Sequence, residues 1–135
     1  EYDSRALVGE DLDGDGRMDI LMIEKVFEHG RDKAEYLRIL YNTWDRPGNW
    51  IGVRLHEHGR GFSPVGARIT VLAGGRRRIL PVVTGDSHRA QHSNQKHFGL
   101  GTVDKVNAIE VRWPNGKVSR LQEPAVNQYH EVKPE

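Results

Sequence analysis

The chain has 135 residues, enough for one ordinary domain or for a small domain with an appendage. It contains no cysteine, which excludes a disulfide framework, a thiolate zinc site and a cysteine nucleophile. The formal net charge of +1 is unevenly distributed, because residues 1–45 carry six basic and twelve acidic side chains and residues 46–135 carry fourteen and seven. This asymmetry predicts two modules, 1–45 and 46–135. No apolar run approaches the roughly 18 residues of a membrane helix, so no membrane insertion is expected.

The first module is predicted to contain strands rather than helices. Residues 19–27 (DILMIEKVF) form an apolar run rich in β-branched and aromatic residues. Residues 35–44 (EYLRILYNTW) fit either a short helix or a strand, and the neighbouring strand signals favour the strand. The polar residues 28–34 between them are predicted to form a turn. The cluster DRPGNW at 45–50 interrupts the pattern, and it places the module boundary there.

The second module alternates between apolar and polar residues, as half-buried strands do. Two of its turns are marked by sequence: Gly74-Gly75 predicts a hairpin, and Asn115-Gly116 suits a type I′ turn. Short strands at this spacing predict an antiparallel sandwich or barrel. The strands are expected at residues 50–58, 65–73, 76–84, 106–113, 117–121 and 127–132.

Residues 11–19, DLDGDGRMD, concentrate four aspartates that repel one another. Asp11, Asp13, Asp15 and Asp19 occupy positions 1, 3, 5 and 9 of this stretch, and the Arg17 carbonyl occupies position 7. Oxygen ligands at these positions of a tight loop are what a hard cation requires. We therefore predict that the four carboxylates and the Arg17 carbonyl bind a divalent ion that offsets their repulsion.

Calcium suits this loop better than the alternatives. Gly14 and Gly16 allow the backbone to turn sharply, with positive φ where needed. An EF-hand would need a bidentate glutamate at position 12 and helices on both sides, but position 12 is Met22, inside a β-like run. Magnesium demands a stricter octahedron. The expected cofactor is therefore Ca²⁺, bound outside an EF-hand.

The loop and its flanks also resemble a known motif. Residues 8–23, VGEDLDGDGRMDILMI, resemble the calcium loop of FG-GAP/VCBS repeats, in which an aspartate loop joins two strands of a propeller blade. The resemblance covers about the first 45 residues. It implies that the first module is a β-propeller-blade-like calcium hairpin, belonging to a longer propeller.

The second module resembles the ASPIC/UnbV family, which occurs at the C-terminus of such repeat proteins. The resemblance spans nearly all of residues 46–135 and implies an antiparallel β-sandwich. One segment departs from the family pattern, because residues 85–96 read GDSHRAQHSNQK where relatives have a Gly/Ser-rich stretch. The residues that carry the resemblance are NWIGVRL (49–55), VGARITVLAGG (65–75), KHFGLG (96–101), VNAIEVRWPNGKV (106–118) and NQYHEV (127–132).

Several side chains outside the loop have two interpretations. His88, His92 and His97 lie close in sequence and could form a transition-metal site, but the family motif favours a packing role for His97. The consecutive arginines at 76–78 cannot all face one way on a strand, so a solvated edge is expected rather than a polyanion site. Tryptophans are either sugar-stacking platforms or packing residues, and packing is the more common role. They are Trp44, Trp50 and Trp113.

The predicted function is a non-catalytic, calcium-binding interaction or adhesion module. The chain begins with Glu1 rather than methionine, so we expect it to be a fragment of something longer. The family resemblance implies the C-terminal part of a longer repeat protein, and we expect that protein to be secreted, periplasmic or on the cell surface. Its partner would be a protein or a glycan. Nucleic acid is not expected, because the basic half lacks an aromatic–basic stacking pattern. Two alternatives stay open: a biosynthetic accessory protein or enzyme of the enediyne type, and a carbohydrate-binding module.

Overall fold

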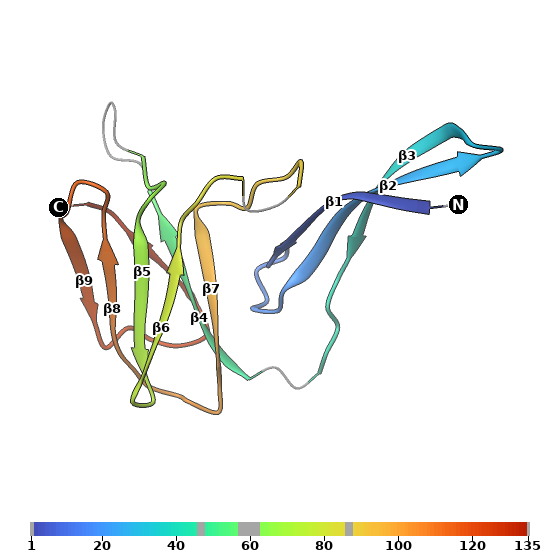
Figure 1. Cartoon of the computed structure of the whole chain (residues 1–135). Helices are drawn as coiled ribbons and strands as arrows, with labels where there is room; N and C mark the ends of the chain where they lie inside the picture. Colours follow the sequence, from blue (N-terminus) through green and yellow to red (C-terminus); the bar gives the residue numbers. More distant parts are fainter. Residues whose placement is uncertain (1, 46–47, 57–62, 86–87, 135) are drawn as a thin grey trace. The chain divides into compact units, whose positions relative to one another are not determined.

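The computed structural model describes residues 2–45, 48–56, 63–85 and 88–134, and every regular element in them is a β-strand. The predicted all-β class is therefore confirmed. Within these residues the chain offers no helix that could span a membrane. The strands in Figure 1 are β1 (Tyr2–Glu10), β2 (Asp19–Glu28), β3 (Arg31–Leu40), β4 (Asn49–Leu55), β5 (Arg68–Ala73), β6 (Arg76–Pro81), β7 (Gln95–Gly101), β8 (Val106–Arg112), β9 (Val118–Gln122) and β10 (Tyr129–Val132).

The strands form two compact units. The charge-based division placed residues 84–92 in the second module, whereas their contacts lie with the first three strands. A side chain of this segment participates directly, because the Gly9 amide donates to His92 Nε2 at 3.4 Å. Charge and turn patterns are local, so they do not reveal which distant strand a loop packs against. The first unit comprises Glu1–Asp45 and Thr84–His92, and the second comprises Arg46–Val83 and Ser93–Glu135.

The first unit is an antiparallel sheet with the strand order β1-β2-β3. Glu10 pairs with Asp19, so residues 11–18 form the loop that joins β1 to β2. His29 and Gly30 form the β2–β3 turn, both with positive φ (52° and 73°), as a two-residue type I′ hairpin requires. The preference for strand over helix at 35–44 is confirmed through Leu40, where β3 ends.

The second unit contains two sheets, β10-β4-β7 and β6-β5-β8-β9 (Figure 1). This arrangement is consistent with the predicted sandwich, and all of its pairs but one are antiparallel. The exception is β10, which runs parallel to β4. The chain reaches β10 from β9, in the other sheet, so no tight hairpin forces an antiparallel direction. The last two residues of the strand predicted at 50–58 lie outside the described residues.

The core of the second unit arises from alternation along its strands. On β4, Ile51, Val53 and Leu55 are buried in one apolar cluster, whereas Gly52 and Arg54 occupy the other face. The same cluster takes side chains from both sheets, so each sheet covers the other's apolar face. Its remaining buried members are Ala67, Ile69, Val71, Ala73, Val82, Phe98, Leu100, Val106, Ile109, Val111, Trp113 and Val132.

The two glycine turns of this unit differ. Gly74 and Gly75 both have positive φ (57° and 70°) and connect β5 to β6 as the predicted hairpin. The type I′ prediction at Asn115-Gly116 is wrong, because only Gly116 has positive φ (84°). The Gly116 amide instead bonds the Trp113 carbonyl at 2.9 Å, which makes Pro114 and Asn115 the central pair. A proline with φ fixed near −65° suits the first central position of a type I turn, followed by a left-handed glycine.

Candidate metal centre

The loop between β1 and β2 is organised by the side chain of Asp11. Its Oδ1 accepts a hydrogen bond from the Gly14 amide at 2.8 Å and its Oδ2 accepts one from the Gly16 amide at 3.0 Å. Both glycines have positive φ (80° and 86°), a conformation that other residues adopt only with strain. Asp11 is only 7% exposed. The Asp/Gly alternation therefore builds a compact loop closed on one buried carboxylate.

Two further carboxylates stand beside Asp11. Asp13 Oδ1 accepts the amide of Asp15 at 3.2 Å, and Asp15 Oδ1 accepts the amide of Arg17 at 2.8 Å, as in Asx-turns. One oxygen from each of Asp11, Asp13 and Asp15 lies within 4.8 Å of the other two. Calcium–oxygen bonds of about 2.3–2.6 Å place ligands on opposite sides of the ion about 5 Å apart. The three oxygens are thus close enough to share one ion.

Asp19 has a different environment from these three. It is 1% exposed, and its two oxygens accept backbone amides, Oδ2 from Leu12 at 3.0 Å and Oδ1 from Asn42 at 2.8 Å. It is not a member of the three-carboxylate group. Asp19 therefore ties the loop at the start of β2 to the segment that follows β3.

Arg17 also connects the loop to this segment. Its Nε donates to the Asn42 carbonyl at 2.6 Å, and its guanidinium forms an ion pair with Asp15. This ion pair offsets part of the loop's negative charge, and cation binding at Asp15 would compete with it. The predicted role of Arg17 as a carbonyl ligand stays a prediction.

Asn42 is the residue of this centre that sequence reasoning missed. Its amide and carbonyl bond Asp19 and Arg17, and its side-chain Oδ1 accepts the Trp44 amide at 3.0 Å. Asp19 and Arg17 lie 23 and 25 positions before Asn42 in the sequence. No local pattern marks such a contact. The only available signal was an Asx residue two positions beyond a strand, which is common in turns.

The three histidines are divided between the two units. His88 and His92 belong to the first unit, and His88 is exposed. His97 lies on β7 in the second unit, where its ring stacks on Trp50 with centroids 5.0 Å apart. Across the described part of the chain, the aspartate loop holds the only group of three potential metal ligands.

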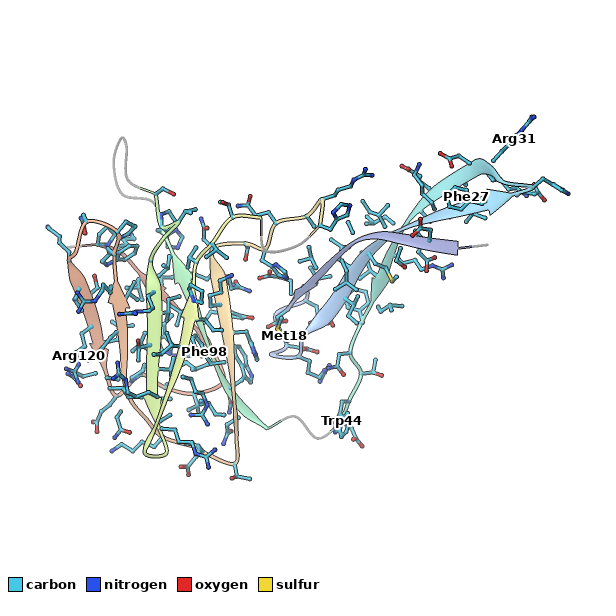
Figure 2. All side chains as sticks on the ribbon, in the orientation of Figure 1. Met18, Phe27, Arg31, Trp44, Phe98 and Arg120 are labelled. Carbon is cyan, nitrogen blue, oxygen red and sulfur yellow. The ribbon has the colours of Figure 1, made fainter. Side chains whose placement is uncertain are left out.

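The three tryptophans have different surroundings. Trp113 is 2% exposed and its Nε1 donates to Ser119 Oγ at 2.8 Å. Trp50, 8% exposed, contacts the rings of His97 and Tyr129, whose centroids lie 5.0 and 4.9 Å from its own. Trp44 follows β3 and is 69% exposed (Figure 2). Packing is thus the role of two of them, and Trp44 alone presents an open aromatic surface.

A comparison with protein families identifies the larger part of the chain. The family model described as ASPIC and UnbV matches residues 58–135. The match begins after β4, whereas the resemblance in sequence starts at residue 46. Among curated proteins, none matches the chain.

Proposed function

Because the chain belongs to the ASPIC and UnbV family, we propose that it is a non-catalytic interaction module. We also propose that calcium stabilises its first unit. The module would be secreted, periplasmic or on a cell surface, as the C-terminal part of a longer repeat protein. The first unit would be a blade of the FG-GAP/VCBS type. Its partner would be a protein or a glycan.

The main support for the calcium proposal is that three carboxylates lie close together in one loop. Asp11, Asp13 and Asp15 supply oxygens within 4.8 Å of one another, and Asp11 is held in place by two backbone amides. Carboxylate oxygens without nitrogen or sulfur ligands favour a hard cation. Calcium also accepts irregular geometry, which suits a loop where each carboxylate already accepts an amide.

The expected effect of the ion is to order the β1–β2 loop. Cation binding would offset the repulsion among three carboxylates and hold the β1–β2 loop in one conformation. Through Asp19 and Arg17, both bonded to Asn42, the same loop is connected to the end of β3. An ion in the loop would therefore order the end of the whole three-stranded sheet.

Calorimetric titration with calcium tests this proposal. The parent chain should bind one calcium ion, and Asp13→Asn should weaken binding about tenfold or more, because a charged ligand is worth at least 1.4 kcal/mol. Asp32→Asn is the matched control, since it removes the same charge from an exposed residue whose partner is Lys25. If the parent binds no calcium, or both variants bind equally well, the loop is not a calcium site.

A second function is supported by one residue. Trp44 is 69% exposed, and an exposed indole is a suitable platform for a sugar ring. A carbohydrate-binding role predicts binding on a neutral glycan array that Trp44→Ala abolishes. Trp113→Phe, a change inside the core, should leave such binding intact. Equal binding by the parent and Trp44→Ala would remove this candidate.

A further inference from the structure

The outer face of the β6-β5-β8-β9 sheet gathers arginines from three different strands. On β5, Ile69 and Val71 point into the core, so Arg68 and Thr70 face outward. Arg68 is directly opposite Arg112 on β8, and Arg77 on β6 is opposite Leu72 on the same outer face. Arg120 on β9, labelled in Figure 2, is opposite Glu110 of β8.

These arginines form a hollow with little negative charge of its own. Like charges directly opposite on neighbouring strands are destabilising, and Arg68 and Arg112 are such a pair. The one carboxylate of the hollow, Glu110, forms an ion pair with Arg120 (Oε1 to Nη1, 3.2 Å). No ion pair joins Arg68, Arg77 or Arg112 to another described residue. The hollow is lined by Arg68, Thr70, Arg77, Glu110, Arg112 and Val118.

The base of the hollow adds a neutral donor. Thr70 is 6% exposed, whereas the three arginines around it are exposed. Guanidinium groups bind planar or tetrahedral oxyanions through paired N–H donors, and a hydroxyl supplies one more donor. The chemistry that fits the hollow is therefore an oxyanion such as a sulfate group.

We propose that this outer face, with Arg68, Arg77 and Arg112 as its anion-binding residues, binds a sulfated polysaccharide. The cations are spread over three strands about 4.8 Å apart and over about 13 Å along the strand direction, which one small ion cannot span. A polymer with repeated sulfates can contact several at once. The hollow has no aromatic side chain for base stacking, which disfavours single-stranded nucleic acid.

The remaining charge of the second unit favours the same partner. Its sequence contains thirteen basic and six acidic side chains, so a polyanion is attracted before contact. Of the three consecutive arginines at 76–78, only Arg77 belongs to the proposed binding face. Arg77 shares the outer face with Arg68, whereas Arg76 and Arg78 pair with the core-facing Ala73 and Val71.

Heparin is the probe, and Arg77 and Arg76 provide a matched pair of variants in the full chain. Arg77→Gln should weaken heparin binding about tenfold, because it removes a charge-assisted contact. Arg76→Gln removes the same charge one residue away on the opposite face of β6, and it should change the affinity less than about twofold. The double variant Arg68→Gln/Arg112→Gln should lose binding while its thermal midpoint stays equal or rises, since opposed charges are removed.

Several outcomes would overturn the proposal. Equal weakening by Arg76→Gln and Arg77→Gln would show attraction to net charge alone. Displacement of heparin by free sulfate at the same sulfate concentration would show a site for single ions. Equally tight binding of a single-stranded oligonucleotide of the same charge would replace the polysaccharide with nucleic acid. The proposal names a partner class for the interaction module and thus rests on that function, but calcium is not needed, so the heparin and calcium experiments fail separately.

Discussion

The two units bury their apolar side chains to very different extents. In the second unit, sheets β10-β4-β7 and β6-β5-β8-β9 share one core in which Ile69 and Ile109 are fully buried. In the first unit, Ile39 and Leu40 are consecutive on β3 and therefore lie on opposite faces, and both are exposed, by 43% and 50%. A sheet with one covered face gains stability from side-chain packing. The first unit must depend more on its hairpins and its loop network.

The largest expected effect on stability comes from replacing a buried isoleucine with alanine, and the same change at an exposed isoleucine of the first unit provides the comparison. Ile109→Ala should lower the free energy of unfolding of the second unit by about 2–5 kcal/mol, because Ile109 is 0% exposed and a cavity would remain. Ile39→Ala should cost the first unit less than about 1 kcal/mol, because Ile39 is 43% exposed. Urea unfolding, followed by tryptophan fluorescence and amide hydrogen exchange, measures both. Equal losses would contradict the contrast in burial.

A second prediction concerns the outer face of the β10-β4-β7 sheet. Gly52→Ala should destabilise the second unit by about 1–3 kcal/mol, because a Cβ at Gly52 would overlap the Tyr129 ring. Gly99→Ala is the matched control on β7, where a Cβ meets no atom within 4 Å. That change should be neutral or slightly stabilising. Thermal unfolding compares the two, and a tolerated Gly52→Ala would show that Tyr129 does not pack on β4.

The third prediction tests what stabilises the first unit without a deep core. Asp19→Asn should lower the free energy of unfolding of the first unit by about 1–3 kcal/mol even without calcium. The two carboxylate oxygens of Asp19 accept the amides of Leu12 and Asn42, whereas an asparagine side chain has only one acceptor oxygen. Asp13→Asn should be nearly neutral in stability under the same conditions, since Asp13 is exposed. Hydrogen exchange of the Leu12 and Asn42 amides reports the difference. Faster exchange in Asp13→Asn than in Asp19→Asn would reverse the assigned roles.

The smallest effects should come from exposed ion pairs, which occur in both units. In the second unit, the hydrogen bond and charge of Lys105 lower the pKa of Glu123, and Glu123 raises the pKa of Lys105 in turn. In the first unit, hydrogen bonds to Asp32 and Glu35 raise the pKa of Lys25. Exposed pairs of this kind are screened by solvent and contribute little stability.

The sign of these shifts sets the pH dependence. The contribution of Glu123 is present above its unfolded pKa and is lost as the pH falls through its lowered folded pKa. The contribution of Lys105 is present below its unfolded pKa and is lost as the pH rises through its raised folded pKa. An NMR titration should show Glu123 titrating below the ordinary range, and Lys105→Gln should restore it. An unchanged midpoint in that variant would contradict the pairing.

Local sequence patterns determined the all-β class and the aspartate loop. Alternation along 49–55 and 106–112 predicts half-buried strands, because successive side chains point to opposite faces. The spacing of Asp11, Asp13 and Asp15 predicts that their carboxylates meet, because Gly14 and Gly16 turn the backbone between them. Each of these features depends on residues within one strand or one loop.

Only the tertiary structure decided which segments meet. The parallel pairing of β10 with β4, the bonds from Asn42 to Asp19 and Arg17, and the row of arginines across three strands all join residues far apart in sequence. Asp19 shows the difference within a single motif: its spacing predicts a ligand, which stays a prediction, whereas its bonds to Leu12 and to a segment 23 residues away are seen only in the tertiary structure. Periodicity is a property of a short stretch, whereas pairing and register depend on how all strands share the available partners.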